Sequence, residues 1–307
     1  MAPVVAAIDC GTNSIRLLVA TAGPEGGLRE LDRRLEINRL GQGVDATGEL
    51  HPEALARTWQ AVDAYAEVIC GLGAERVRFV ATSAARDARN REAFFGGVRE
   101  RLGVEVDIIP GTEEARLSFT GALTGVPEAA EPVLVVDIGG GSTELVLGGA
   151  DGSIRHAVSL DMGSVRLRER YLHHDVPTID EVAQARAFVD GLLDGSGIDF
   201  TAVRGFIGVA GTATSLSAIS QGLATYQREK VHRSHLTTER LLELSAELLA
   251  TPVVQIEATT CLPRKRAEVI CAGALINAAI ARRVSVPMVV SESDILDALA
   301  LELLQQG

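Results

Sequence analysis

Lysine is almost absent from this chain of 307 residues. Lys230 and Lys265 are the only two, so arginine makes up nearly all of the 29 basic residues, against 41 acidic ones and a net charge of −12. This acidic balance argues against nucleic acid and membrane surfaces as general partners. It leaves room for a small anionic substrate, because clustered arginines bind phosphate through a planar fork of donors.

Long hydrophobic runs are also missing, and no apolar stretch of the sequence is long enough to cross a bilayer. The first residues, MAPVVAAIDCG, lack the basic region of a signal peptide, and we expect a buried strand there. The cysteines have no metal-ligand spacing, and although two disulfides are formally possible, we expect reduced thiols in a cytoplasmic protein. They are Cys10, Cys70, Cys261 and Cys271.

The chain repeats itself. AAIDCGTNSIRLLVA (6–20) aligns with LVVDIGGGSTELVLG (134–148), and each copy is typical of a strand, a turn and a second strand. A second pair follows in the same order, VRFVATSAARDARN (77–90) and GFIGVAGTATSLSAI (205–219), each a strand, a turn and a helix with Thr or Ser expected as the N-cap. Two matched elements in one order predict a duplicated pair of α/β domains.

Further elements are expected between and after the repeats. A strand is predicted at 106–109 and a helix from Thr112, whose first turn carries two acids, and GVPEAAEP (125–132) is the expected linker. Other helices are predicted at 52–72, 179–193, 239–249, 263–283 and 294–306.

The duplicated turns have the composition of phosphate-binding loops. Residues without Cβ atoms let a phosphate approach several backbone N–H groups, and hydroxyl and amide side chains add donors. The predicted phosphate-binding residues are Thr12, Asn13 and Ser14 in the first turn, Gly139, Gly140, Gly141, Ser142 and Thr143 in the second, and Gly211 and Thr212 in a third.

Carboxylates flank the second turn. Asp137 and Glu144 would repel a phosphate unless a divalent cation lies between, so we predict that they bind a metal ion, together with Asp9, the counterpart of Asp137. The simpler interpretation is ordinary turn chemistry, since Gly-rich hairpins with Asp at a strand end are common. The pattern is neither a Walker A loop nor a dinucleotide-binding fingerprint, because no Gly-Lys-Ser/Thr follows and the glycines precede a strand.

Seven blocks in order resemble the exopolyphosphatase / guanosine pentaphosphate phosphohydrolase family, within the actin-like ATPase and sugar-kinase superfamily. They cover most of the chain to about residue 240. The blocks are IDCGTNSIRLLV (8–19), RLGQGVDATGEL (39–50), ATSAARDARN (81–90), PGTEEARLSFTGA (110–122), DIGGGSTEL (137–145), MGSVRLRERY (162–171) and GVAGTATSL (208–216).

The resemblance implies two duplicated actin-like (RNase H-like) α/β domains, 1–125 and 126–293, with a central cleft and a final helix (294–307) that returns to the first domain. It implies hydrolysis of a terminal phosphoanhydride that depends on Mg²⁺, with Mn²⁺ as an alternative ion. It also implies that Glu114 is the general base, with Glu113 as its competitor. Arg86 and Arg39, with Arg16 and Arg89 behind them, are candidates to stabilise the transition state.

The expected substrate is inorganic polyphosphate, which would make the chain an exopolyphosphatase. Guanosine pentaphosphate or tetraphosphate is the alternative, either as a substrate or as the ligand of a non-catalytic sensor, and a kinase or ATPase of the wider superfamily is a third class. The chain resembles the short form of the family, and its tail departs from the family's usual ending. A short form leaves room for a homodimer whose second subunit extends the anion track.

Two basic segments have open interpretations. Residues 228–240 and 264–266 would either contact distal phosphates or simply be solvated at the start of helices. The pair His173–His174 has no third ligand nearby in the sequence, which argues against a metal site there.

Overall fold

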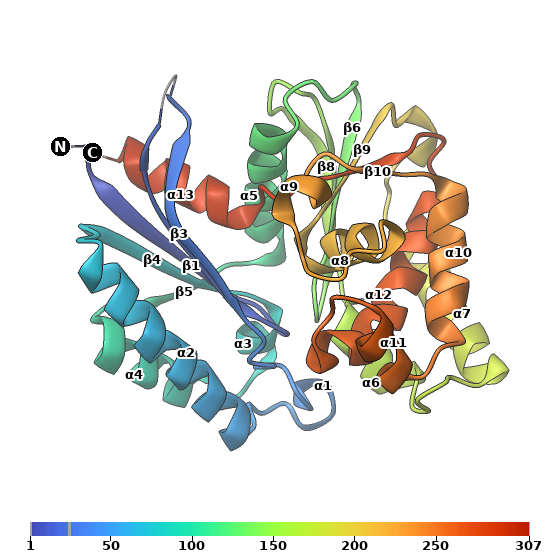
Figure 1. Cartoon of the computed structure of the whole chain (residues 1–307), viewed down its shortest axis with the longest axis horizontal. Helices are drawn as coiled ribbons and strands as arrows, with labels where there is room; N and C mark the ends of the chain where they lie inside the picture. The colour runs from blue at the N-terminus through green and yellow to red at the C-terminus, as the bar shows by residue number, and fades with distance from the viewer. Residues whose placement is uncertain (1, 24–25, 307) are drawn as a thin grey trace. The chain divides into compact units, whose positions relative to one another are not determined.

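The computed structural model of the chain describes residues 2–23 and 26–306 and divides into two compact units (Figure 1). Unit 1 comprises Met1–Leu117 and Ile295–Gly307, and unit 2 comprises Ser118–Asp294. The chain passes from unit 1 to unit 2 inside helix α5 (Gly111–Gly125). It returns to unit 1 directly before helix α13 (Ile295–Gln305). The expected linker, residues 125–132, therefore belongs to unit 2, and its first residue, Gly125, is the last residue of α5.

Unit 1 is built on a five-stranded sheet with the order β3-β2-β1-β4-β5. The central strand β1 runs antiparallel to β2 and parallel to β4, which is parallel to β5. Besides α5 and α13, its elements are β1 (Val4–Cys10), β2 (Ile15–Ala22), β3 (Leu28–Glu36), α1 (Val44–Thr47), α2 (Pro52–Gly71), β4 (Arg76–Ala81), α3 (Ser83–Asp87), α4 (Arg91–Leu102) and β5 (Val106–Ile108).

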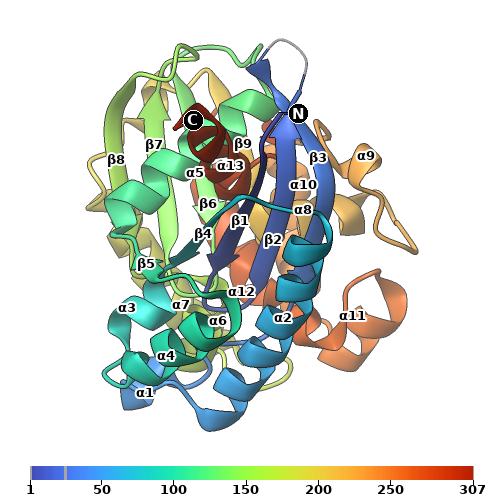
Figure 2. The same ribbon diagram turned by 90° about the vertical axis from the view of Figure 1, so that its left-hand side faces the viewer.

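Alternate residues of β1 enter two different cores. Ala6, Ile8 and Cys10 pack into the cluster that includes α2 and α4, whereas Val5 and Ala7 pack with α13. Figure 2 shows α2 and α13 beside the strands of this sheet. The strand is apolar on both faces because helices cover both, as the continuous hydrophobic run in the sequence indicates.

Unit 2 contains a six-stranded sheet with the order β10-β11-β9-β6-β7-β8. Its strands are β6 (Val133–Ile138), β7 (Thr143–Gly148), β8 (Ile154–Leu160), β9 (Gly205–Val209), β10 (His235–Leu236) and β11 (Met288–Val290). Its helices are α6 (Ser164–Tyr171), α7 (Ile179–Asp194), α8 (Ala210–Ser220), α9 (Arg228–Val231), α10 (Thr238–Leu249), α11 (Val253–Thr259) and α12 (Arg264–Ala281), with a 3₁₀ turn at Phe200–Ala202.

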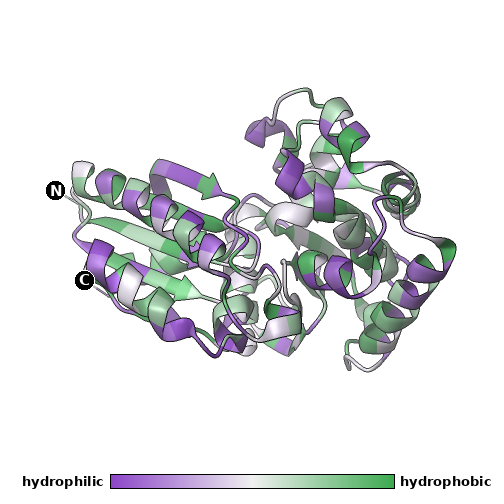
Figure 3. Ribbon diagram, turned by 90° about the horizontal axis from the view of Figure 1, so that it is seen from below, coloured by the Kyte–Doolittle hydropathy of each residue, from purple (hydrophilic) through white to green (hydrophobic). Residues whose placement is uncertain are grey.

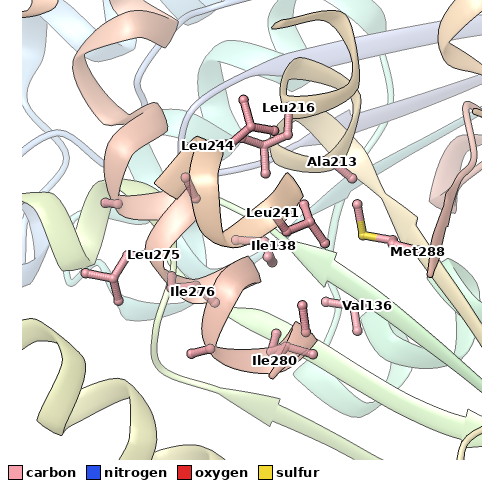
Figure 4. Packing of buried hydrophobic residues seen from close by; sticks show 14 of the residues in the cluster. Val136, Ile138, Ala213, Leu216, Leu241, Leu244, Leu275, Ile276, Ile280 and Met288 are labelled. Carbon is pink, nitrogen blue, oxygen red and sulfur yellow. The ribbon is translucent and has the colours of Figure 1, made fainter. Parts of the chain in front are cut away.

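Helix α12 is the centre of the hydrophobic core of unit 2. Every residue from Val269 to Ala281 is buried, and Ile276 and Ile280 pack among side chains of α8, α10 and β6 (Figure 4). Val136 and Ile138 supply the face of β6 that meets this core. A helix that is apolar on all sides is typical of one enclosed by its neighbours.

The two sheets confirm the predicted duplication. The order β3-β2-β1-β4-β5 in unit 1 has the same connectivity and strand directions as β8-β7-β6-β9-β11 in unit 2. Unit 2 adds only the two-residue strand β10 at one edge. The fold class predicted from the sequence, α/β with two duplicated units, is therefore confirmed.

Hydropathy follows this arrangement along the chain. Figure 3 shows hydrophilic and hydrophobic residues alternating along the helices, whereas several strands are mainly hydrophobic.

The five helices predicted at 52–72, 179–193, 239–249, 263–283 and 294–306 are present as α2, α7, α10, α12 and α13. Their ends differ from the predicted ones by no more than two residues. Across the described residues, no helix combines the length and the apolar character that a membrane span requires.

The hydroxyl N-caps predicted for 77–90 and 205–219 are correct in position for one helix only, and neither helix has the predicted capping hydrogen bond. Thr82 is the N-cap of α3 but its side chain accepts no capping hydrogen bond, and the N-cap of α8 is Val209. The nearby hydroxyls bind elsewhere: Ser83 pairs with Thr12, and Thr212 donates to the carbonyl of Ile138. These hydroxyls connect helices α3 and α8 to the duplicated turns instead of capping the helices.

Candidate functional site

The turn between β1 and β2 is closed by one backbone hydrogen bond, from the N–H of Gly11 to the carbonyl of Ser14 at 2.9 Å. The turn between β6 and β7 has the same closure, from Gly139 to Ser142 at 3.0 Å. The two turns predicted to bind phosphate are thus built alike. They differ in the elements that hold them.

In unit 1, the loop after β3 holds the turn. The N–H groups of Arg39 and Gly41 donate to the carbonyls of Asn13 and Thr12, at 3.0 and 2.9 Å. Arg39 has a left-handed backbone (φ 51°), which is uncommon outside glycine and costs energy. A Cβ atom at Gly41 would lie 2.2 Å from the Thr12 methyl group, so only glycine permits this approach. The predicted arginine Arg39 is therefore fixed next to the turn by its own backbone.

The side chain of Asn13 is almost fully buried, with 4% of its surface exposed. Neither its amide nitrogen nor its amide oxygen has a hydrogen-bond partner among the described residues. Such a group costs about 1–3 kcal/mol unless a ligand or water satisfies it. Its neighbour Thr12 does have a partner, the hydroxyl of Ser83 at 2.8 Å. Asn13 is thus the residue of this turn whose side chain most clearly requires a ligand.

The two acids at the start of α5 have different surroundings. Arg116 donates to both carboxylate oxygens of Glu113, at 2.7 and 2.8 Å, and these hydrogen bonds lower the pKa of Glu113. Arg116 also binds Glu302 of α13, so Glu113 belongs to an ion network that joins two helices. Glu114 is buried, and its Oε2 lies 3.6 Å from the guanidinium of Arg86.

Arg86 is held by a backbone group as well, since it donates to the carbonyl of Ile109 at 2.9 Å. Unit 1 thus brings together the predicted residues Arg86 and Glu114. The weaker candidate Arg16 instead forms an ion pair with Asp9, its partner across the β1–β2 ladder, at 2.6 Å. Arg89 is largely exposed (72% of its side chain) and contacts Glu49.

In unit 2, the first turn of α6 holds the glycine turn. The N–H of Ser164 donates to the carbonyl of Gly139 at 2.9 Å, and those of Val165 and Arg166 donate to Gly140 at 2.9 and 3.0 Å. The side chain of Arg166 donates through Nε to the carbonyl of Gly141 at 2.8 Å. Three successive carbonyls of the turn therefore face one helix terminus.

This arrangement determines where the N–H groups of the turn point. In a trans peptide the C=O and the following N–H point in opposite directions. Because the carbonyls of residues 139, 140 and 141 face α6, the N–H groups of residues 140, 141 and 142 point away from it. Successive N–H groups presented in this way form an anion-binding concavity. In unit 1 the same reasoning turns the N–H groups of Asn13 and Ser14 away from the Arg39 loop.

Asp137 and Glu144 are direct partners across the β6–β7 ladder and so share one face of the sheet. Both are buried; Asp137 accepts a hydrogen bond from Ser118 at 2.8 Å, and Glu144 accepts one from Ser159 at 2.7 Å. Like charges directly opposite each other destabilise a sheet. Their burial side by side fits a site where a cation is bound.

No three His, Cys, Asp or Glu side chains within residues 2–23 and 26–306 are grouped closely enough to hold a metal ion by themselves. A pair of carboxylates suffices for Mg²⁺, which keeps several waters and binds substrate phosphates. The cross-strand partner of Asp9 is the cation Arg16, which pairs with it, whereas the cross-strand partner of Asp137 is the acid Glu144. The charge of the cross-strand partner thus distinguishes the two copies of the repeat.

The third predicted turn begins α8. Ala210 has a left-handed backbone (φ 59°), and the helix starts without a side-chain cap. Thr212 donates its hydroxyl to Ile138, so that hydroxyl supports the glycine turn. At Gly211 a Cβ atom would lie 2.2 Å from the guanidinium of Arg266, which places this cation of the 264–266 segment against the start of α8.

Much of the other basic sequence is paired with acids. Arg228 lies 3.4 Å from Glu292, Arg233 lies 3.6 Å from Glu128, and Arg240 contacts Glu243 and Glu247. Arg264 contacts Glu257 and Glu268. These pairs show that several arginines of 228–240 and 264–266 contribute to ordinary ion pairing.

Several residues that support the site were not predicted. Ser118 and Ser159 bind the two carboxylates, Ser83 binds Thr12, and Ser164 and Arg166 bind the glycine turn. Ser164 and Arg166 lie in MGSVRLRERY (162–171), a block of the family resemblance whose residues were given no role. Ser83 and Ser118 lie in two other blocks of the resemblance, 81–90 and 110–122, which gave neither of them this role. Only Ser159 lies outside the blocks, as a lone serine that the sequence cannot distinguish from any polar surface residue.

Comparison with known proteins agrees with these features. The profile of the Ppx/GppA phosphatase family matches residues 18–292. Exopolyphosphatase 2 of Mycobacterium tuberculosis is 44% identical over 97% of this chain and 98% of its own length. A crystal structure of an exopolyphosphatase-like protein is 37% identical and superposes with a TM-score of 0.94, covering 99% of this chain and 98% of the other.

A more distant relative has another substrate in its name. The guanosine-5′-triphosphate,3′-diphosphate pyrophosphatase of Photobacterium profundum is 32% identical over 80% of this chain. The match covers 51% of that longer protein.

Proposed function

Because the chain belongs to the Ppx/GppA phosphatase family, we propose that it is an exopolyphosphatase, which hydrolyses the terminal phosphate of inorganic polyphosphate and releases orthophosphate. The observation that best supports this proposal is the pair of duplicated turns with outward-pointing N–H groups. Those groups suit the equatorial oxygens of a phosphoryl group during transfer.

Glu114 is the proposed general base. It accepts a proton from the water that attacks the terminal phosphorus, while the bridging P–O bond breaks and the shortened chain leaves. Glu113 is less suited to this task, because both of its oxygens already accept hydrogen bonds from Arg116. Arg86, anchored on the carbonyl of Ile109, keeps the carboxylate of Glu114 in place.

Asp137 and Glu144 are the proposed ligands of Mg²⁺, with Mn²⁺ as a substitute, because their paired carboxylates are the hard oxygen donors that these ions prefer. The ion would neutralise negative charge on the phosphates. Ser118 and Ser159 hold the two carboxylates in position. The proposal assigns no metal contact to Asp9 while Arg16 occupies its carboxylate.

Guanosine pentaphosphate is the second candidate substrate, supported by the relative from Photobacterium profundum. The same residues would act on its terminal phosphate. A sensor without catalysis is less well supported, because binding alone does not require a buried carboxylate such as Glu114.

The experiment compares wild type, Glu114→Gln and Glu113→Gln. Each is incubated with Mg²⁺ and, separately, short polyphosphate, long polyphosphate, guanosine pentaphosphate and ATP, and orthophosphate release is measured. We expect release from polyphosphate, a loss of kcat of about 10²–10⁴-fold in Glu114→Gln, and near wild-type kcat in Glu113→Gln.

The outcomes separate the candidates. Release from guanosine pentaphosphate alone would move the function to that substrate. Tight binding without release from any substrate would leave a sensor. An equal loss in both variants would remove the assignment of Glu114 as the base.

A further inference from the structure

In α6, the side chain of Arg166 binds the last peptide of the glycine turn. The carbonyls of Gly139 and Gly140 accept backbone N–H groups of the helix, which almost any residue at these helix positions would supply. The carbonyl of Gly141 instead accepts the Nε–H of Arg166 at 2.8 Å. The orientation of the Gly141–Ser142 peptide therefore depends on a specific side chain.

The neighbouring residues make this dependence stronger. Glycines lose more conformational freedom on folding than other residues, so a turn of three of them does not hold one shape by itself. The helix approaches so closely that a Cβ atom at Gly163 would lie 2.4 Å from the carbonyl carbon of Gly140. On the far side, Thr143 is held by its hydroxyl, which donates to the carbonyl of Met162. The Gly141–Ser142 peptide lies between Gly140, which packs against Gly163, and Thr143, which is held through its hydroxyl.

We propose that Arg166 is a positioning residue for phosphate binding. By holding the carbonyl of Gly141 toward α6, it turns the N–H of Ser142 in the opposite direction, where it completes a row of three donors with Gly140 and Gly141. This inference rests on the proposed function of the turn as a phosphate site. It adds a residue that acts on the ligand through the backbone of the turn.

The two units reach this result by different means. In unit 1 the carbonyls of Thr12 and Asn13 are held by backbone N–H groups of the Arg39 loop. In unit 2 the carbonyl of Gly141 is held by a side chain, that of Arg166. Among the hydrogen bonds described for the two turns, no carbonyl of the unit 1 turn is held in this way. A substitution at position 166 should therefore affect one half of the repeat and leave the other intact.

The test uses Arg166→Met and Arg166→Lys, with Arg170→Met as the matched control. Arg170 lies on the same helix, with its guanidinium 5.9 Å from the ring of Phe188. The ammonium of a lysine can still donate to the Gly141 carbonyl, so Arg166→Lys should restore part of the effect. The probe is inorganic phosphate with Mg²⁺, titrated while the amide NMR signals of Gly140, Gly141 and Ser142 are followed.

In wild type we expect the three amide signals to shift together with phosphate. In Arg166→Met the apparent Kd should rise about 10-fold or more, with the response of Ser142 lost first, and kcat for orthophosphate release should fall about 10²-fold. Arg170→Met should match wild type. Because a purely structural defect would lower thermal stability without singling out Ser142, the residue-specific shift distinguishes the two roles.

Wild-type binding and an unchanged Ser142 response in Arg166→Met would overturn the inference. If Arg166→Met does not fold, Arg166→Lys decides: a loss of phosphate affinity or kcat in which the Ser142 signal still responds as in wild type would also overturn the inference, because that loss would not act through the Gly141–Ser142 peptide. Failure of the proposed function would look different. Phosphate would bind, with the predicted dependence on position 166, but no substrate would release orthophosphate.

Discussion

At the scale of single residues, Asn13 and Asn38 form an informative contrast. Both are buried, with 4% and 1% of their surface exposed. Asn38 donates its amide nitrogen to the hydroxyl of Thr58 at 2.9 Å and leaves only its oxygen without a partner, whereas neither amide atom of Asn13 has a partner among the described residues. A buried amide kept without partners lowers the stability of the fold, which is typical of a group reserved for a ligand.

Replacing Asn13 should therefore improve stability and impair binding. Asn13→Leu removes an unsatisfied amide at similar volume, so we expect the free energy of unfolding to rise by about 1 kcal/mol and KM for polyphosphate to rise about 10-fold or more. Urea denaturation and steady-state kinetics measure the two quantities. Asn38→Leu is the control and should lose stability, because it leaves Thr58 without its donor. A loss of stability in Asn13→Leu would show that the amide has a structural role.

At the scale of elements, the contact between α6 and the glycine turn depends on Gly163. This residue precedes the helix without a side-chain cap, because the carbonyls of the turn accept the N–H groups of the helix. The helix terminus and the turn thus satisfy each other's backbone groups. Damage to either one should disturb both.

Gly163→Ala tests this mutual support. Its Cβ would meet backbone atoms of Gly140 and Gly141 at 2.4–2.5 Å, so the turn or the helix must move. We expect kcat/KM for orthophosphate release to fall about 10²-fold. Gly191→Ala in α7 is the control, since nothing lies within 4 Å of its Cβ, and it should gain about 0.4–1 kcal/mol of stability. Equal activity of the two variants would contradict the mutual support.

The sequence predicted elements well where the pattern is local. The periodicity of α2 and α12 and the repeat of the Asp-x-Gly hairpin defined helices, strands and the duplicated fold. The turns themselves were predicted to bind phosphate, and Glu114 was preferred to Glu113 only through family resemblance. The contacts of Ser118, Ser159 and Arg166 join residues 15 to 25 positions apart, and no local pattern encodes such pairings.

At the scale of the whole molecule, α13 is attached to unit 1 by ion pairs as well as by its apolar face. Arg116 and Arg78 both contact Glu302, and Arg33 contacts Asp297. Glu113 joins the same network through Arg116. The network is partly exposed, so each pair stabilises the fold only modestly.

The network makes stability depend on pH with a predictable sign. Hydrogen bonds from Arg116 lower the folded-state pKa of Glu113 below its ordinary value of 4.5. The ionised carboxylate therefore stabilises the fold fully above that value, and the contribution disappears as the pH falls through the lower, folded-state pKa. Glu113→Gln should lower Tm at pH 7 by at most about 2 °C, and the difference from wild type should shrink as the pH falls below 4.5. Thermal unfolding at several pH values measures this, and a gap that persists in acid would contradict it.

The return of α13 to unit 1 also sets an order of events during synthesis. Residues 118–294 of unit 2 are contiguous, so all of them leave the ribosome before Ile295 does. Unit 1 cannot complete its core until α13 has been made. Residues Ile295, Leu299 and Leu303 of this helix cover the face of the sheet that carries Val5, Ala7 and Leu18. The half that is made first is therefore completed last. A nascent chain that stops before α13 leaves that apolar face uncovered, and exposed apolar surface of this kind makes incomplete chains prone to aggregate.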